Sequence, residues 1–296
     1  MRRVGTGVLA GLVLAAGPVG CGAEDGAKDG GRSPVIEGSS PAPSPYPGPL
    51  WVADRAKGRV DGSETEHDPA TWGTGAAGRA VECAARLYGG GPSEPWSEGD
   101  GGGTPEEGLK LFFEIEQPDL PQSGYRVERT EGERVLYSLD VKGRTKVAVI
   151  VAKDRPNRPG WGPETTAWCD PAELPAGFAE SKGYEVWTDR DGRRVPVAEL
   201  SSGAGPEHCD WQKAHFLQVG AEPERRSYGR DPDGVLPEEM LTSRYEADVT
   251  MPGDARDTGR RLNRWELWMA ADDAKAYVRT PRGVEAWPAV RGGGCA

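Results

Sequence analysis

The sequence predicts an α+β protein with two small antiparallel-sheet modules and a few short helices, after a signal peptide and a disordered tether. Two observations predict this class. Glycine and proline number 43 and 26 among 296 residues, so turns should be frequent and strands short. Short runs of β-branched and aromatic residues, separated by turn pairs such as Asp-Gly and Lys-Gly, recur in both halves of the chain.

Residues 1–20 have the pattern of a bacterial lipoprotein signal peptide. Two arginines precede an apolar run of 17 residues, which is short for the roughly 20 residues that span a bilayer. Gly20 and Cys21 supply the small residue and the thiol that lipid transfer needs, although Pro18 stands where leucine is usual. We therefore expect Cys21 to carry lipid, with a transmembrane helix and a plain secretory signal as the alternatives.

The tether is expected over residues 21–50. This stretch is rich in glycine, proline and serine and is too polar to bury a core. After it, we expect an N-terminal α+β module over 51–195 and a C-terminal α+β module over 196–296. Each would contain a hairpin-based sheet and a helical piece.

Residues 104–118 carry the clearest helix signal. Thr104 and Glu107 form a capping box around a proline at the first helical position, and the glutamate faces the positive end of the helix dipole. Apolar residues follow at helical spacing from Leu109, and a proline then ends the pattern. The sequence predicts a helix over 105–116 that buries this apolar face.

The other elements follow from apolar alternation and turn residues. The first module should contain a helical face near Cys83, a loop over 154–163, two helical turns over 170–182, and these strands: Tyr125–Arg129, Arg134–Val141, Lys146–Ala152, Glu164–Trp168, and a hairpin of Tyr184–Thr188 with Arg193–Glu199. The second module should contain a strand Lys213–Val219, a polar loop over 220–237, a helix Glu238–Ala247, a hairpin of Arg264–Ala270 with Lys275–Thr280, and a strand Val284–Trp287.

The chain has five cysteines. If Cys21 carries lipid, four remain, and an even number in an exported protein indicates two disulfides with three connectivities open. We favour Cys83–Cys169 and Cys209–Cys295, because each pair would close a loop within its own half of the chain.

The net charge of −11 excludes several partners. Basic residues occur at most in isolated pairs, whereas binding to a nucleic-acid backbone needs a concentrated basic face. We therefore expect no nucleic-acid partner. Adhesion to anionic lipid through surface charge is disfavoured for the same reason.

No motif assigns a catalytic, cofactor-binding or metal-binding residue. The run Gly73–Gly78 matches GxGxxG but follows a polar stretch, so a glycine-rich turn explains it better than a dinucleotide site. The Asp-Gly pairs at Asp191 and Asp233 fit turns better than calcium loops. Serine-hydrolase signatures are absent from the sequence, and its three histidines (His67, His208 and His215) lack zinc-ligand spacing.

Two weaker sets remain. Carboxylate neighbours could serve a glycosidase if they faced each other across a cleft, but solvated surfaces explain them more simply; they are Glu114 with Glu116, Glu238 with Glu239, and Asp272 with Asp273. Tryptophans could stack on sugars, although core packing is the simpler interpretation; they are Trp161, Trp168, Trp211, Trp265, Trp268 and Trp287. Strand alternation puts Trp265 and Trp268 on opposite faces, and Trp168 and Trp211 are expected to pack on disulfides.

Several short motifs resemble an uncharacterised actinobacterial family of exported lipoproteins. They are Thr71-Trp72-Gly73-Thr74-Gly75, Gly124-Tyr125-Arg126-Val127, Gly160-Trp161-Gly162, Trp168-Cys169-Asp170-Pro171, Glu207-His208-Cys209-Asp210-Trp211-Gln212, and the ending Val284-Glu285-Ala286-Trp287-Pro288 with Cys295-Ala296. The resemblance implies lipidation, export and paired cysteines. It implies no activity and no catalytic residues.

Together these features predict a lipid-anchored protein on the outer face of the cytoplasmic membrane. Its membrane contact would be the N-terminal lipid, and its partner a protein or a cell-wall glycan. We expect a non-enzymatic binding or interaction module. The alternative is a cell-envelope hydrolase that uses a carboxylate pair.

Overall fold

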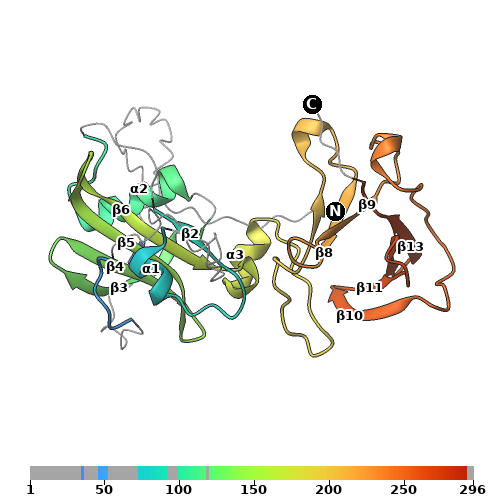
Figure 1. Ribbon diagram of the computed structural model, residues 1–296, viewed down its shortest axis with the longest axis horizontal. Helices are drawn as coiled ribbons and strands as arrows, with labels where there is room; N and C mark the ends of the chain where they lie inside the picture. The colour runs from blue at the N-terminus through green and yellow to red at the C-terminus, as the bar shows by residue number, and fades with distance from the viewer. Residues whose placement is uncertain (1–34, 37–45, 53–72, 92–98, 118–119, 292–296) are drawn as a thin grey trace, which may run out of the picture. The chain divides into compact units, whose positions relative to one another are not determined.

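A computed structural model of the chain describes residues 35–36, 46–52, 73–91, 99–117 and 120–291 (Figure 1). These residues form three sheets and a few short helices, and strands predominate. The prediction of antiparallel sheets with a few short helices is confirmed. One exception to antiparallel pairing is the short β1, which lies parallel to β3.

The first sheet has six strands in the order β1-β3-β4-β5-β6-β2. Their bounds are β1 Val35–Ile36, β2 Leu87–Gly90, β3 Ser123–Glu131, β4 Arg134–Val141, β5 Arg144–Arg155 and β6 Arg158–Cys169. The predicted meander is confirmed, but the predicted loop over 154–163 is wrong. β5 and β6 continue into a tight turn in which Asp154 and Asn157 adopt left-handed φ angles of 48° and 60°, a conformation that Asp and Asn tolerate well.

One face of this sheet is covered by helix α2 (Pro105–Leu111) and its π-helical continuation η3 (Phe112–Glu116). The predicted capping box is present: the Glu107 amide donates to Thr104 Oγ1 at 3.2 Å, and the Thr104 amide donates to Glu107 Oε2 at 3.2 Å. The apolar face that begins at Leu109 is buried as predicted and packs against inward-facing valines of β5. The helix prediction is therefore confirmed, although its last turn is π-helical.

The opposite face is covered by helix α1 (Gly75–Ala80), which begins within the GxGxxG match. Its alanines pack on Leu136 and Ile150, so both faces of the central strands are buried. The helical face expected near Cys83 is wrong, because this segment leads into β2 instead. Tyr46 and Leu50 are buried in the same cluster, so the end of the expected 21–50 tether packs on the folded part.

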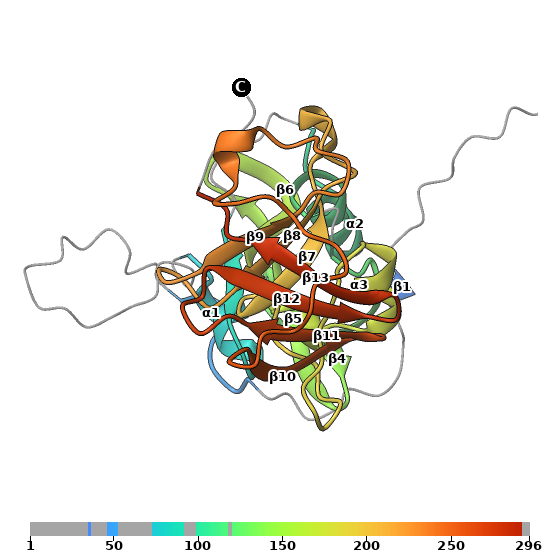
Figure 2. The same ribbon diagram turned by 90° about the vertical axis from the view of Figure 1, so that its right-hand side faces the viewer.

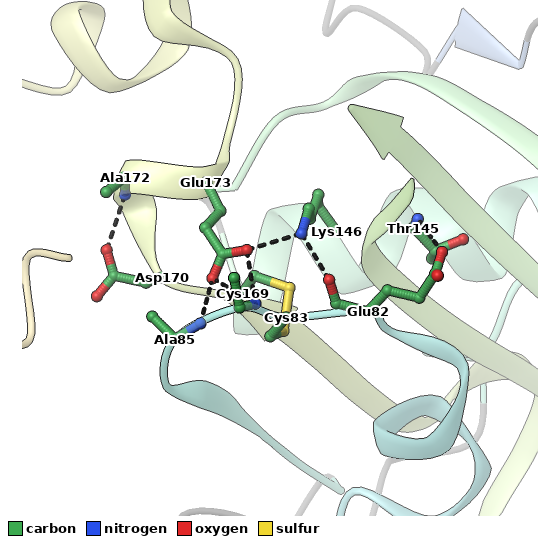
Figure 3. Close-up of a disulfide and its surroundings, with 10 residues drawn as sticks. Glu82, Cys83, Ala85, Thr145, Lys146, Cys169, Asp170, Ala172 and Glu173 are labelled. Atoms are coloured by element: carbon green, nitrogen blue, oxygen red, sulfur yellow. Dashed lines mark hydrogen bonds and ion pairs between the residues drawn. A yellow bond between two sulfur atoms is a disulfide. The ribbon is translucent and has the colours of Figure 1, made fainter. Parts of the chain in front are cut away.

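A disulfide between Cys83 and Cys169 joins the segment before β2 to the end of β6 (Figure 3). Beside it, Lys146 Nζ donates to Glu173 Oε2 at 2.7 Å and to the Glu82 carbonyl at 2.5 Å. Burial opposes ionisation of Glu173, but hydrogen bonds from Lys146 and from two backbone amides hold the pKa of this carboxyl below its usual range. The bridge thus lies beside a cluster in which Lys146 and Glu173 are hydrogen-bonded to each other and to the backbone.

After the first sheet, the chain forms a 3-10 turn, η4 (Pro171–Glu173), and helix α3 (Ala176–Ser181). Both helical turns expected over 170–182 are present. Two smaller sheets follow: β7-β8-β9 and β10-β11-β12-β13. Their strands are β7 Leu200–Ala204, β8 His215–Val219, β9 Arg226–Arg230, β10 Arg256–Leu262, β11 Trp265–Met269, β12 Lys275–Thr280 and β13 Gly283–Pro288.

The expected strands at 213–219 and 284–287 and the hairpin of 264–270 with 275–280 are confirmed as β8, β13, β11 and β12. The prediction of a polar loop over 220–237 is wrong, because this stretch contains β9. The sequence also did not predict β7 and β10. The predicted helix at 238–247 is also wrong. In this stretch the described chain forms the 3-10 turn η6 (Glu238–Met240) and then runs beside β13 through a bridge between Glu246 and Ala286. Another 3-10 turn, η5 (Glu207–Cys209), precedes β8.

The two smaller sheets are joined at both sides and enclose a second core (Figure 2). On one side, Glu185 bridges to Ser202 of β7 and Thr188 bridges to Arg261 of β10. On the other side, Tyr228 of β9 bridges to a residue that follows β13. The hairpin predicted from 184–188 and 193–199 is reduced to an isolated bridge, because its first segment closes this core instead.

The second core contains the buried residues Trp187 and Val195. Both residues lie in the range 51–195 that the sequence assigned to the first module. The part of the chain that packs into the second core therefore begins soon after α3. Within the described part of the chain, no helix is long and apolar enough to cross a membrane.

Candidate functional site

The second core becomes polar at one end. Along β7, β8, β9 and β13, alternate side chains point into it, and the apolar positions are Leu200, Leu217, Tyr228 and Trp287. The inward positions two residues away are Ser202, His215, Arg230 and Glu285. Together with Glu185 on residues 184–188, which we call the closing segment, these four residues form a group that we call the polar end.

Glu185 lies at the centre of one half of the polar end. Its Oε2 is 2.8 Å from His215 Nε2 and also accepts the hydroxyl hydrogen of Ser202. Trp187 Nε1 donates to the Ser202 hydroxyl oxygen at 2.9 Å. Ser202 of β7 and His215 of β8 thus hold the carboxylate in one orientation.

Arg230 and Glu285 form the other half. Arg230 Nε donates to Glu285 Oε2 at 2.7 Å, and Nη2 donates to Oε1 at 3.3 Å. Trp287 Nε1 donates to the same carboxylate at 3.0 Å, and the guanidinium lies over the Tyr245 ring at 5.6 Å. This bidentate pair is geometrically specific and links β9 to β13.

Three aromatic rings connect the two halves. The His215 ring meets Trp265 and Trp287 edge-on, with centroid separations of 5.9 and 5.7 Å, and the two indoles meet edge-on at 6.0 Å. Such edge-to-face contacts are favourable and fix the orientation of each ring. Trp287 is fully buried, whereas Trp265 is half-buried at the end of β11.

Both carboxyl groups are held in the anionic form. Burial opposes ionisation of Glu185, but hydrogen bonds from His215 and Ser202 keep its pKa below the usual range. Burial also opposes ionisation of Glu285, and Arg230 and Trp287 lower the pKa of this carboxyl. Because Glu185 is anionic, the imidazole Nε2 carries the hydrogen that it donates to Oε2.

Three polar atoms have open hydrogen-bonding capacity, two of them in Glu185 and His215 of the polar end and one in the adjoining Trp265 of β11. Among the described residues, nothing contacts Glu185 Oε1, His215 Nδ1 or Trp265 Nε1 as a hydrogen-bond partner, and none of the three is a buried, unsatisfied atom. The side chains of Glu185 and His215 are 30% and 17% exposed. The polar end and Trp265 therefore offer a carboxylate acceptor, an indole donor and an imidazole nitrogen to a ligand.

The arrangement differs from that of a serine nucleophile. Such a hydroxyl is activated when an imidazole accepts its hydrogen. Here the Ser202 hydroxyl donates to Glu185, and the carboxylate lies between the hydroxyl and the imidazole. The geometry suits a fixed set of hydrogen-bonding groups for a bound ligand.

The cysteines predicted from the sequence have different outcomes. The Cys83–Cys169 pairing is confirmed, whereas Cys21 and Cys295 lie outside the described residues. Cys209 is disulfide-bonded. Its pairing with Cys295 stays a prediction.

The other candidates are dispersed. Glu114 and Glu238 form exposed ion pairs with Lys110 and Arg244, and Asp273 pairs with Arg226. The side chain of Glu116 lies outside the described residues, as does His67, while His208 is exposed. In the parts of the chain that the structure describes, no three His, Cys, Asp or Glu side chains group as metal ligands.

The tryptophan predictions hold in part. Trp265 packs against the second core and Trp268 lies on the opposite face under Arg279, as strand alternation predicted. Trp211 packs beside Cys209, as expected, and meets the Phe216 ring at a tilt of 44°. Trp168 was also expected to pack on a disulfide, and its ring stacks on Tyr88 next to the Cys83–Cys169 bridge.

Sequence reasoning considered His215 and Trp265 separately and missed Glu185, Ser202, Arg230 and Glu285 as members of one group. The comparisons with known proteins add no further assignment. No protein-family model, no curated protein and no solved structure matches this chain.

Proposed function

We propose that this chain is a lipid-anchored, extracytoplasmic binding protein of the cell envelope. Cys21 would carry the lipid and hold the chain on the outer face of the cytoplasmic membrane. The polar end of the second core would bind its partner, a protein or a cell-wall glycan.

The location is supported by the lipoprotein pattern around Cys21 together with the disulfide of Cys83 and Cys169. Structural disulfides persist in oxidising compartments and are rare where thiols are kept reduced. An exported, anchored chain accounts for both features.

The observation that carries the binding role is the polar end itself. Its groups occupy inward strand positions where apolar side chains would otherwise pack, and burying polar groups is costly unless they are hydrogen-bonded. They are bonded to one another, yet Glu185, His215 and Trp265 retain open positions. A set of groups that is fixed before binding loses little entropy when a ligand arrives.

Binding is favoured over hydrolysis by a carboxylate pair because of the ionisation of these groups. A glycosidase general acid needs a raised pKa so that it is protonated at neutral pH. The pKa values of Glu185 and Glu285 are instead lowered, so both carboxylates act as hydrogen-bond acceptors or ion-pair partners.

The anchor and the site can be tested in one experiment with the tagged full chain, expressed in a bacterium that lipidates exported proteins. Wild-type protein should enter the detergent phase on phase separation, and Cys21→Ser should remain in the aqueous phase. Cross-linking in intact cells should capture an envelope component that Glu185→Gln loses. Glu238→Gln, which changes a carboxylate that is 90% exposed, is the matched control and should retain the capture.

Equal detergent partitioning of wild-type and Cys21→Ser protein would refute the anchor. Capture that is unchanged by Glu185→Gln, or lost equally with Glu238→Gln, would refute the assignment of the binding site.

A further inference from the structure

We infer that the polar end binds a neutral, hydroxyl-rich ligand, namely a segment of glycan that contacts Glu185, His215 and Trp265. This inference rests on the proposed function and names the class of ligand for the same site.

The first argument is hydrogen-bond complementarity. Glu185 Oε1 requires a donor, Trp265 Nε1 requires an acceptor, and His215 Nδ1 accepts from a ligand group or donates to it according to the protonation of the ring. A sugar hydroxyl is both a donor and an acceptor, so adjacent hydroxyls on one ring can satisfy all three atoms. The amide of an N-acetylated sugar offers the same combination.

The second argument concerns charge. An anionic ligand has no hydrogen to donate to Glu185 and would approach two carboxylates, Glu185 and Glu285. The one guanidinium of the polar end, on Arg230, is already held in a bidentate pair. An amine would satisfy Glu185 but supplies no acceptor for Trp265 Nε1. A neutral polyol avoids both mismatches.

The third argument is the aromatic surface. Trp265 is half-buried, and edge-on contacts with His215 and Trp287 hold its ring in place. An indole in a fixed orientation presents an apolar surface beside polar groups, which is the combination that binding sites use to hold and orient a ligand. The C–H groups of a pyranose ring supply the matching apolar surface.

The test uses the full chain in detergent micelles and isothermal titration calorimetry. The probes are a β-1,4-linked tetramer of N-acetylglucosamine, maltotetraose as a second neutral glycan, and a lysine-rich tetrapeptide as a cationic probe. Wild-type protein should bind at least one glycan and should not bind the peptide.

Two conservative variants and one control locate the site. Glu185→Gln keeps the size of the side chain but replaces one acceptor oxygen with a donor group, and Trp265→Phe removes Nε1 while keeping an aromatic ring. Each should weaken glycan binding by at least about tenfold, because each leaves a hydrogen-bonding group of the complex unmatched. Trp268→Phe is the control: it lies on the opposite face of β11, and its Nε1 has no partner among the described atoms. It should bind as wild-type protein does.

Binding of neither glycan by wild-type protein would overturn the inference, as would glycan binding that both site variants leave unchanged. If the peptide binds and the glycans do not, the ligand class is wrong. The proposed function fails separately, when Glu185→Gln leaves the cross-linked capture in cells intact. Circular dichroism of each variant verifies that it is folded before its affinity is compared.

Discussion

Removal of the Cys83–Cys169 disulfide should destabilise the first sheet by several kcal/mol. The bridge joins residues that are 86 positions apart, and on the chain-entropy model a loop of this size stabilises the folded state by about 4–5 kcal/mol. The perturbation is the double variant Cys83→Ala with Cys169→Ala. It leaves Cys209 unchanged, so the other disulfide can still form.

Two structural effects modify that value. Cys169 is fully buried, so its truncation to alanine adds about 1 kcal/mol for lost packing. A second effect limits the loss of stability. In the folded variant the amides of Ala84 and Ala85 still donate to Glu173, which keeps the segment before β2 attached. We therefore expect the loss to arise mainly in the unfolded state, with native spectra nearly unchanged.

The assay is urea unfolding followed by far-ultraviolet circular dichroism, analysed with the wild-type slope as a reference. The transition that involves the first sheet should shift to lower urea by an amount that corresponds to about 4 kcal/mol. A loss below about 1 kcal/mol would refute the reasoning. A variant with altered native spectra would show that the bridge maintains the folded geometry and does more than restrict the unfolded chain.

Two further predictions concern stability. Gly108→Ala should destabilise the protein by about 1–3 kcal/mol in the same urea assay, because its new Cβ would lie 2.5 Å from Val151 Cγ1 and 3.0 Å from the Gly162 amide nitrogen. Gly177→Ala in helix α3 is the control, with open space around its Cβ, and should be neutral or slightly stabilising; equal effects of the two would contradict the close approach of α2 to the sheet. The unfolding free energy should also fall as the pH drops below 4.5, the reference pKa of a glutamate, since Glu173, Glu185 and Glu285 have lowered pKa values in the folded state and bind protons more weakly there than in the unfolded chain. Substitution of Glu285 by Gln should reduce this acid dependence, and an unchanged pH profile would argue against the Arg230–Glu285 pair.

The features that the sequence predicted correctly are those with a local physical cause. The capping box of Thr104 and Glu107 needs only neighbouring residues, and it fixes the start of α2. The meander from β3 to β6 follows from apolar runs joined by short turns, and its pairs are close in sequence. Strand alternation likewise separated Trp265 from Trp268.

The features that were missed depend on distant contacts. β9 has the sequence RSYGR, in which Tyr228 is the one bulky apolar side chain, and it becomes a strand through pairing with β8. The segment after Met240 lacks the predicted helix because Leu241 and Glu246 bridge to Val290 and Ala286, so tertiary pairing overrides local helix propensity. Helix α1 consists largely of alanine and glycine, and small residues carry little periodic signal.

The polar end could not be predicted for the same reason. Its members come from the closing segment and from β7, β8, β9 and β13, and they are separated by as many as 100 residues, from Glu185 to Glu285. Two of these strands, β7 and β9, were not predicted from the sequence. A polar residue at an inward strand position becomes recognisable only when the pairing of all five segments is known.

Hydrogen–deuterium exchange of the full chain, with and without a solubilised envelope fraction, tests most directly whether the polar end is the binding site. The expected result is slower exchange in residues 185–188, 200–204 and 215–219 when the envelope fraction is present, with β3 to β6 unchanged. Slower exchange confined to the first sheet, or no change in these three segments, would contradict the assignment.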